Sequence, residues 1–490
     1  MTRIPKFLFF VLLAGLNGHT LFAREVAIEA DVSRTGEPIH PFVYGQFIEH
    51  LGRCIYGGIW AEMLEDRKFY FPVTPDYNPY GNAAGEAYPV VSASPWQISG
   101  SPEGVEMDEE DSFVGDHTPR IQEGSGIRQN DLGVKSGETY KGYFWAKAPS
   151  AHVRVTFGVG NQSESRTFRV RRSRYEKFEY SFKAPLDTDK AFLEIQVESG
   201  EAHIGTVSLM PADNIRGMRA DTVALLKELN APIYRWPGGN FVSGYEWRDG
   251  IGDRDRRPPR RNPAWTGVEH NDFGTDEFID FCREINTEPA IAVNTGFGDP
   301  HTAAEWVAYC NDKSGSHAAD MRRENGNRDP YNVKYWCVGN EMFGTWQLGY
   351  MQLHHYTEKH NRTARAMWEV DDTLTLIGVG AIGGINADHD PTAAKANRGW
   401  SRGMLEASSK YMTWISEHFY DGRTPWSEKG VLPVKEHVQL MKNNIRRIVD
   451  RHRALQASVS QLNGRTVPIA MDEWNYWHRD YYYGELGCIY

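Results

Sequence analysis

The sequence predicts an α/β fold: a (β/α)8 barrel, incomplete with about seven strands, that carries an inserted antiparallel β-sandwich. Two patterns along the chain support this prediction. From Asp213 onward, short apolar runs alternate with longer helix-like segments, which is typical of βαβ units and a parallel sheet. Between about residues 85 and 210, short runs of alternating apolar and polar residues are separated by turn residues, which indicates antiparallel strands with one solvated face.

Length and composition agree with this fold class. The chain has 490 residues, of which 40% are hydrophobic and 24% are charged, so a globular protein is expected rather than a fibrous or disordered one. The formal net charge is -11, which would repel a polyanion. We therefore expect no nucleic acid among the partners.

The barrel requires strands in βα alternation, and seven apolar runs fit that requirement. The first is expected near Phe42, and the others are Ile233–Trp236, Pro289–Asn294, Val333–Gly339, Thr373–Val379, Tyr411–Ser416 and Val467–Met471. Helix-like spacing lies between them at Thr222–Leu229, Asp276–Ile285 and Ala303–Tyr309. Residues 24–84 and 211–490 are thus expected to form the barrel, and residues 85–210 the insert. Too few residues follow the seventh strand for an eighth, so we expect a C-terminally truncated piece of a longer protein, ending at Tyr490.

Residues 1–23 have the pattern of a signal peptide. Arg3 and Lys6 precede the apolar run Phe7–Leu16, and Ala23 ends a plausible cleavage stretch. The run is too short to span a membrane, which takes roughly 20 apolar residues. We expect an exported protein, periplasmic or extracellular, without a membrane partner. The alternative is an uncleaved anchor.

The cysteines predict neither a disulfide framework nor a zinc site, because they show no paired spacing. They are Cys54, Cys282, Cys310, Cys337 and Cys488. We expect most of them to be buried thiols.

Polar residues follow the ends of the apolar runs, where a barrel of this kind places its catalytic groups. They are Glu49 and His50, Asn240, Asn294, Asn340 and Glu341, His418 and Tyr420, and Asp472 and Glu473. Glu341 and Glu473 are thereby expected to face one mouth. Hydrolysis of a glycosidic bond needs such a pair, one carboxylic acid and one carboxylate. The alternative for a single terminal glutamate is a surface salt bridge, but six polar strand ends in register favour a site.

Four motifs, in order along the chain, closely resemble glycoside hydrolase family 51, the α-L-arabinofuranosidases. They are FIEHLGRCIYGG (Phe47–Gly58), RWPGGNFVSGY (Arg235–Tyr245), GNE (Gly339–Glu341) and DEWN (Asp472–Asn475). The resemblance covers most of the chain outside the insert and the first 23 residues. Members of that family continue beyond the seventh strand, which this sequence does not do.

The resemblance implies a role for each matching residue. Glu341 corresponds to the general acid/base and Glu473 to the nucleophile, so anomeric configuration would be retained by double displacement. Glu49, Asn240 and Asn340 correspond to positions that hold the furanose hydroxyls. Tyr420 resembles the tyrosine that orients the nucleophile, and a phenol there would also stabilise the carboxylate of Glu473. No cofactor is implied.

Other polar positions have more ordinary interpretations. Side chains alternate along a strand, so Asp472 is expected to face away from Glu473 as a structural residue. His50 and His418 are expected to position other groups rather than to bind metal. Gly238 and Gly239 are expected to form a tight turn that aims Asn240. The basic run Arg254–Arg261 is expected to be a solvated loop, with contact to substrate as the alternative.

The insert looks like a carbohydrate-binding module, or else it is a spacer that shapes the substrate site. Its candidate sugar-stacking residues, for which core packing is the alternative, are Trp96, Tyr140, Trp145 and Tyr175.

The expected function is release of terminal α-L-arabinofuranosyl residues from plant-type glycans that contain arabinose. The alternatives are an endo-glucanase or xylosidase on the same scaffold, and a non-catalytic glycan-binding protein. The sequence leaves a homo-oligomer open as a partner.

Overall fold

The computed structural model describes residues 33, 35–83, 90–382, 399–421 and 433–476. The chain divides into two units, Met1–His40 and Pro41–Tyr490, and all the elements described below belong to the second. The predicted signal peptide at residues 1–23 and the chain end at Tyr490 lie outside the described residues. Within the described part, no helix combines the length and the apolar content needed to cross a membrane.

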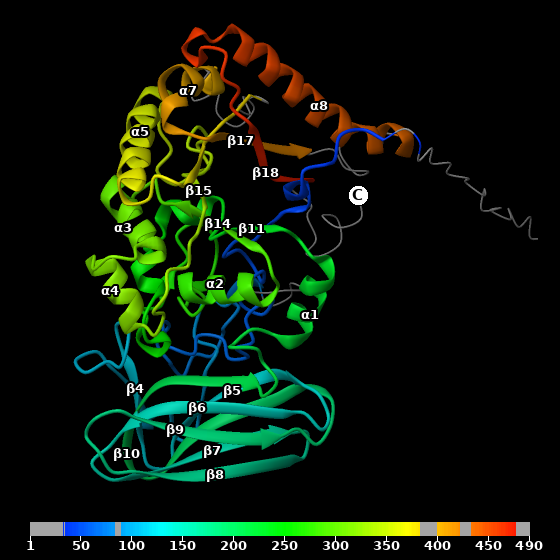
Figure 1. Cartoon of the computed structure of the whole chain (residues 1–490). Helices are drawn as coiled ribbons and strands as arrows, with labels where there is room; N and C mark the ends of the chain where they lie inside the picture. Colours follow the sequence, from blue (N-terminus) through cyan, green and yellow to red (C-terminus); the bar gives the residue numbers. More distant parts are fainter. Residues whose placement is uncertain (1–32, 34, 84–89, 383–398, 422–432, 477–490) are drawn as a thin grey trace, which may run out of the picture. The chain divides into compact units, whose positions relative to one another are not determined.

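Seven parallel strands form one sheet (Figure 1). They are β1 (Gln46–Phe47), β11 (Ile233–Trp236), β14 (Glu288–Val293), β15 (Tyr335–Val338), β16 (Thr375–Gly378), β17 (Trp414–Asp421) and β18 (Ile469–Tyr476). They are hydrogen-bonded in that order, and every pair is parallel. The two end strands, β1 and β18, also contact one another, so the sheet is nearly closed. The predicted incomplete (β/α)8 barrel is confirmed.

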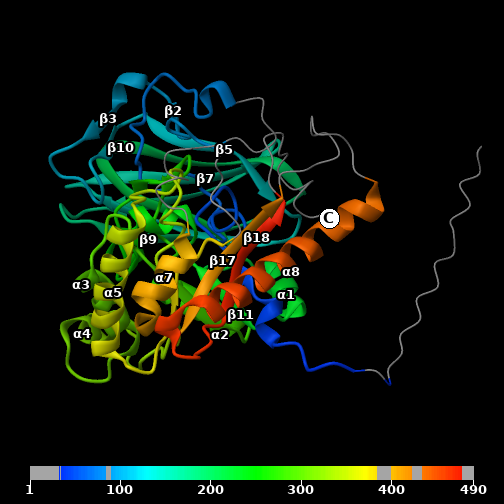
Figure 2. The same ribbon diagram turned by 90° about the horizontal axis from the view of Figure 1, so that it is seen from above.

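Helices alternate with these strands along the chain and lie outside the barrel (Figures 1 and 2). They are α1 (Ala220–Leu229), α2 (Thr275–Glu284), α3 (Pro300–Asn311), α4 (His317–Glu324), α5 (Leu353–Val370), α7 (Trp400–Ser408) and α8 (Val434–Ser458). Large aromatic side chains fill the space between helices and strands: the ring of Trp236 stacks on that of Phe278 at 4.9 Å. Helix α3 begins at Pro300, where the missing N–H costs nothing, and Asp299 accepts from Thr302 N as its N-cap.

Short elements complete the described chain. The 3-10 helices are Pro41–Tyr44, Gly81–Ala83, Pro102–Gly104, Asn240–Gly244, Trp247–Gly250, Arg254–Arg256, Ser409–Tyr411 and Ser460–Leu462. Strands β12 (Arg260–Arg261) and β13 (Val268–Glu269) form an antiparallel pair.

All seven predicted barrel strands are found, although the first, expected near Phe42, begins only at Gln46. Phe42 lies in the 3-10 helix Pro41–Tyr44, and the first strand is only Gln46–Phe47. The strand does not include the whole apolar run, because the side chains of that run are not all buried: Val43 is 67% exposed and Tyr44 is 61% exposed. Of this run, the ring of Phe42 packs edge-on against Tyr335, at 5.2 Å.

Strands β2–β10 form two antiparallel sheets packed on a common core. They are β2 (Gln97–Ser99), β3 (Val105–Asp108), β4 (Thr118–Gln122), β5 (Gly126–Val134), β6 (Thr139–Lys147), β7 (Ala151–Val159), β8 (Gln162–Val170), β9 (Glu176–Lys183) and β10 (Thr188–Pro211). One sheet has the order β8-β7-β10-β5-β2 and the other β9-β6-β10-β4-β3. Buried and exposed residues alternate along β7, as predicted for a sandwich strand.

Strand β10 belongs to both sheets and changes sheet near Gly200. Its first part pairs with β5 and β7, and the part from Glu201 onward pairs with β4 and β6. Gly200 has φ +81°, and a Cβ there would lie 2.3 Å from the carbonyl oxygen of Ser150. Only glycine fits this bend, which lets a single strand tie the two sheets together.

The predicted sugar-stacking platform is not formed by the four aromatic residues named for it. Trp96 is fully buried and Tyr140 is 4% exposed. Trp145 and Tyr175 are half-buried, and both pack against the Phe113 ring, at 5.3 and 4.8 Å between ring centroids. Core packing, the alternative named for them, describes these residues better.

A buried network of charged side chains joins the sandwich to the barrel. Arg67 donates to both carboxylate oxygens of Asp272, at 2.6 and 2.7 Å, and to Asp255 Oδ1 at 3.0 Å. Asp255 also accepts from Tyr143 and Trp145 of β6. The expectation that Arg254–Arg261 is a solvated loop is therefore wrong for its central residues: Asp255 and Arg257 are 3% and 4% exposed.

We expect Arg67→Met to lower the free energy of unfolding by about 3 to 5 kcal/mol, because it leaves the carboxylates of Asp255 and Asp272 buried without their main partner. Urea unfolding followed by tryptophan fluorescence measures the change. The matched control is Lys190→Met, which removes an exposed ion pair with Asp131 and should change stability by less than about 1 kcal/mol. Equal effects of the two substitutions would contradict the assignment.

Candidate active site

Arg235 is the buried cation at the centre of the strand ends. It lies in β11, and its side chain is 5% exposed. Its Nη1 donates to Glu473 Oε2 at 3.0 Å, its Nη2 donates to Asn340 Oδ1 at 2.5 Å, and its Nε lies 3.4 Å from Asp472 Oδ2. Because a buried guanidinium requires acceptors, it holds the ends of β11, β15 and β18 at fixed positions.

Glu341 follows β15 in a strained backbone conformation, with φ +42°. Both of its carboxylate oxygens accept hydrogen bonds. His418 Nδ1 lies 2.8 Å from Oε1, and Trp346 Nε1 donates to Oε2 at 2.5 Å. The strained turn and its two partners fix where this carboxylate points.

Glu473 and Asp472 point into the same site, although they are consecutive in β18. The pairing of β17 with β18 shifts between Glu417 and His418, so that Asp472 is an extra residue in β18. Such a bulge rotates the chain and turns both side chains inward. The prediction that Asp472 faces away from Glu473 is therefore wrong. Asp472 accepts from Ser416 Oγ at 2.6 Å and forms an ion pair with Arg235.

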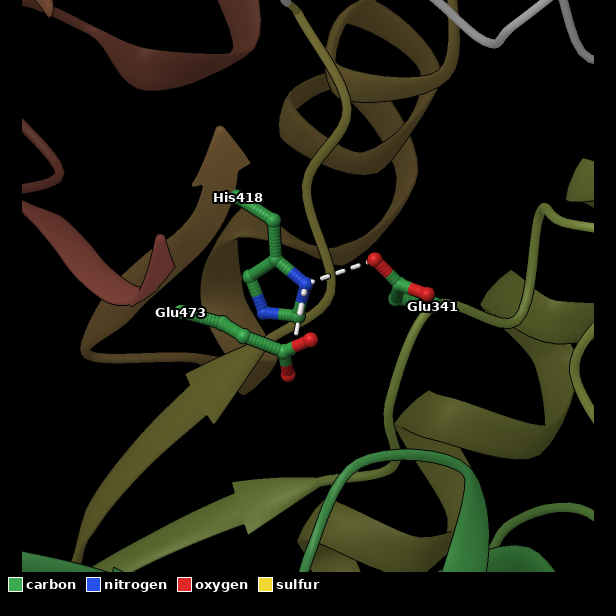
Figure 3. A group of neighbouring side chains, drawn as sticks. All are labelled: Glu341, His418 and Glu473. Carbon is green, nitrogen blue, oxygen red and sulfur yellow. Dashed lines mark hydrogen bonds and ion pairs between the residues drawn. The ribbon is translucent and has the colours of Figure 1, made fainter. Parts of the chain in front are cut away.

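The two carboxylates of the predicted pair meet across the site. One carboxylate oxygen of Glu341, one of Glu473 and a ring nitrogen of His418 all lie within 4.8 Å of one another. Figure 3 shows the imidazole of His418 beside both carboxylates. His418 Nδ1 is 3.7 Å from Glu473 Oε2, and Nε2 is 3.4 Å from Asp472 Oδ1.

Glu49 and Asn340 converge with Glu473 on the same point. A Cβ placed on Gly239 would lie 3.2 Å from Glu473 Oε2, 3.4 Å from Asn340 Nδ2 and 3.5 Å from Glu49 Oε2. Gly238 and Gly239 therefore leave open a space that three polar groups border, in addition to forming the expected turn.

The remaining predicted residues lie around this space. The hydroxyl of Tyr420 donates to Glu473 Oε1 at 2.5 Å. Asn240 points toward the loop after β15 instead: its Nδ2 donates to Trp346 O and its Oδ1 accepts from Leu348 N, both at 2.8 Å. One N–H of Asn240 remains for another partner.

His50 is a positioning residue, as the sequence suggested. Its Nε2 accepts from Trp236 Nε1 at 2.9 Å, so Nδ1 carries the hydrogen that faces Glu269 Oε2 at 2.6 Å. Both nitrogens are thus engaged away from the two predicted catalytic carboxylates.

The charges of the site perturb its titratable groups. Burial would lower the pKa of His418, but the negative charge of Glu473 and the hydrogen bonds to Asp472 and Glu341 raise that pKa well above its ordinary value. Burial would likewise raise the pKa of Glu341, but the hydrogen bond and charge of His418 hold it below its ordinary value. Burial also opposes ionisation of Asp472, but the charge of Arg235 together with the charge and hydrogen bond of His418 and the hydrogen bond of Ser416 outweighs it, so the pKa of Asp472 falls to about 2.

Among the described residues, Glu341, His418 and Glu473 form the group whose ligand atoms are close enough to surround a metal ion. His418 Nδ1 is already held against Glu341, and Arg235 supplies positive charge to Glu473. These contacts engage atoms that a metal ion would need as ligands.

Sequence reasoning gave no role to several residues that build the site. Arg235 begins the motif RWPGGNFVSGY, and its charge inside an apolar strand is the signal that could have indicated its role. Trp265 Nε1 donates to Glu49 Oε1 at 3.0 Å, and Gln347 accepts from Asn340 Nδ2 at 3.0 Å. Both lie in loops, where no periodicity marks a functional side chain.

Two carboxyl groups opposed in this way, at the carboxyl ends of barrel strands, are the arrangement that hydrolysis of a glycosidic bond uses. Residues 225–430 match the family model described as the alpha-L-arabinofuranosidase 1 domain. This range includes Asn240, Asn340, Glu341 and Tyr420.

Named relatives agree with this match. The chain is 35% identical over 262 residues to the intracellular exo-alpha-(1->5)-L-arabinofuranosidase of Acetivibrio thermocellus, an alignment that covers 54% of this chain and 50% of that one. It is 44% identical over 179 residues to the probable alpha-L-arabinofuranosidase C of Aspergillus fumigatus, covering 36% and 35% of the two chains. This chain thus spans at most about half the length of these relatives.

Solved structures show the same likeness. The arabinose-bound MgGH51 α-L-arabinofuranosidase has a TM-score of 0.59 at 18% identity, covering 77% of this chain and 61% of that one, which shows the fold. The arabinose complex of the α-L-arabinofuranosidase from Thermotoga maritima is 39% identical, with a TM-score of 0.47 and coverage of 54% and 50%. The resemblance stated from the motifs is confirmed: the chain is similar to the α-L-arabinofuranosidases of glycoside hydrolase family 51.

Stability should depend on pH through Glu49. Burial and the charge of Glu473 raise its pKa to about 7, so the folded protein holds a proton that the unfolded chain releases at lower pH. The proton on Glu49 therefore stabilises the folded state. This stabilisation is fully present below about pH 4.5 and is lost as the pH rises through about 7. In Glu49→Gln the free energy of unfolding should fall less between pH 5 and pH 8 than in the wild type, by about 1 to 3 kcal/mol.

Urea unfolding at the two pH values measures this difference. The control is Glu228→Gln, an exposed position in α1, which should keep the wild-type slope. Equal slopes for all three proteins would rule out the assignment to Glu49.

Proposed function

We propose that the protein acts as a retaining α-L-arabinofuranosidase, which releases terminal α-L-arabinofuranosyl residues from arabinose-containing polysaccharides or oligosaccharides. The observation that carries this proposal is the opposition of Glu341 and Glu473 within 4.8 Å, with Arg235 beside Glu473. Retaining glycosidases use carboxyl groups only about 5 to 5.5 Å apart, whereas inverting ones leave room for a water molecule between them. The short separation supports retention.

In the first step Glu473 is the nucleophile. Its carboxylate attacks the anomeric carbon while Glu341 gives a proton to the glycosidic oxygen, so the C–O bond breaks and the aglycone leaves as an alcohol. Tyr420 and Arg235 both donate to Glu473. They aim the carboxylate before the attack, and their hydrogen bonds to it weaken as the covalent bond forms.

In the second step Glu341 is the base. It takes a proton from water, the water oxygen bonds to the anomeric carbon, and the carboxylate of Glu473 leaves. The hydrogen bonds that Glu341 accepts from His418 and Trp346 favour its ionised form, which this step requires.

Glu49 and Asn340 are proposed to hold the furanose hydroxyls, because they border the space beside Gly239 together with Glu473. A hydroxyl next to the reacting carbon can strengthen its hydrogen bond to Asn340 as positive charge develops. Asn240 can offer the sugar its second N–H and the second lone pair of Oδ1, since the loop after β15 takes one hydrogen bond from each end of its amide.

We also propose that residues 24–84 and 211–490 form the barrel and that residues 85–210 form the insert. The ionic network around Arg67 supports an insert that is fixed to the barrel, which suits a role in shaping the substrate site.

Export is a separate proposal that rests on the sequence pattern of residues 1–23. The Acetivibrio thermocellus relative is named as an intracellular enzyme. Recovery of the native protein in the cytoplasmic fraction of the producing cells, with its own Met1 at the N-terminus, would overturn export.

We expect Glu473→Ala in the full-length protein to lower kcat on an aryl α-L-arabinofuranoside by at least about 10³-fold, because no covalent intermediate can form. The control is Glu358→Ala, an exposed glutamate of α5 paired with Arg362, which should leave turnover unchanged. Proton NMR of the first-formed sugar should show the α anomer. Near-normal turnover by Glu473→Ala would exclude the nucleophile, and a β product would exclude retention.

A further inference from the structure

The imidazole of His418 is surrounded by hydrogen-bond acceptors. Nδ1 faces Glu341 Oε1 at 2.8 Å and Glu473 Oε2 at 3.7 Å, and Nε2 faces Asp472 Oδ1 at 3.4 Å. A neutral ring would turn a lone pair toward a carboxylate at one of its nitrogens. The surroundings therefore favour the imidazolium, which carries a hydrogen on both.

Beside an imidazolium, both hydrogen-bond partners that Glu341 has among the described residues, Trp346 and His418, are donors. The indole of Trp346 has no lone pair to offer, so its N–H must donate to Oε2. His418 faces the other oxygen. A protonated Glu341 would need a neutral His418 that accepts at Nδ1, and that lone pair would also face Glu473 Oε2 at 3.7 Å. The resting geometry thus fits an ionised Glu341, which is the form required of a base and not of an acid.

The number of protons at the site does not settle which group is the acid. A protonated His418 beside an ionised Glu341 holds as many protons as a neutral His418 beside a protonated Glu341. The two states differ by transfer of one proton over a single 2.8 Å hydrogen bond. Asp472 and Glu473 on β18 and Arg235 on β11 are the other charged groups at this pair, and Tyr420 follows on the ring's own strand.

We propose that His418 stores the proton that Glu341 delivers: in the free enzyme the proton lies on His418 Nδ1, and it passes to Glu341 only as the glycosidic bond breaks. This inference rests on the proposed function. The perturbed pKa values of the two groups point the same way. His418 does not touch the reacting atoms in this scheme, so it is a positioning residue that acts through Glu341.

The proton balance closes over the two steps. In the first, the proton moves from His418 Nδ1 to Glu341 and on to the leaving oxygen, while Glu473 bonds to the anomeric carbon. His418 is then neutral and Glu341 is ionised. In the second, Glu341 takes a proton from the attacking water and returns it to His418, and Glu473 is released as a carboxylate.

The location of the proton is tested without any reaction. In the full-length protein labelled with ¹⁵N-histidine, the His418 signal is identified by its loss in His418→Gln. It should show an imidazolium from about pH 5 to pH 8, and Glu341→Gln should lower the pH at which it titrates. A neutral His418 at pH 7 in the wild type would overturn the proposal, whether or not the protein is an arabinofuranosidase.

Kinetics test the delivery. A 2,4-dinitrophenyl leaving group needs little help from an acid, whereas a sugar alcohol needs it fully. His418→Gln should therefore lower kcat/KM for an α-1,5-linked arabinobiose by about 10²-fold or more, but for the dinitrophenyl glycoside by less than about 10-fold. It should also move the alkaline limb of the pH profile for the biose.

His301→Gln, at an exposed position, is the control and should change neither substrate. Equal losses on the two substrates with an unmoved pH profile would show a merely structural role and overturn the inference. His418→Asn, which is shorter, provides a second variant if His418→Gln does not fold. Wild-type protein that turns over neither substrate would refute the proposed function, while the NMR titration would still decide where the proton lies.

Discussion

The need to neutralise a buried guanidinium governs this site. Arg235 lies in an apolar strand with almost no access to water, so its charge must be met by acceptors from across the barrel. Asp472 and Glu473 provide the opposite charge from β18, and Asn340 provides an amide oxygen after β15. The same contacts that satisfy the cation therefore fix the proposed nucleophile and its neighbours.

Asp472 and Glu473 meet this requirement because β18 contains one more residue than the facing part of β17. The bulge directs two consecutive carboxylates into one space, so that one pairs with Arg235 and Ser416 while the other remains for chemistry. His418, opposite the bulge, lies between this pair and Glu341. A local irregularity of one strand thus brings Glu341, Glu473 and the imidazole of His418 together.

The sandwich is tied to the barrel by a second set of buried charges, centred on Arg67. Asp255 receives hydrogen bonds from Arg67 and from Tyr143 and Trp145 of the sandwich. Removing any one partner leaves a charge or a polar group without compensation, so this junction resists change more than a solvated linker would. The aromatic residues of β6 serve the junction and the core instead of an exposed sugar platform.

The sequence by itself determined the parallel strands, their order and the polar groups at their ends, because periodicity and strand-end residues are local properties of the chain. It also singled out Glu341 and Glu473. Only the tertiary structure decided that Asp472 turns inward, that Arg235 links three strands, and that the basic run Arg254–Arg261 is buried at its centre. These features depend on a bulge and on charges brought together from distant positions, and no local pattern encodes which distant partners will meet.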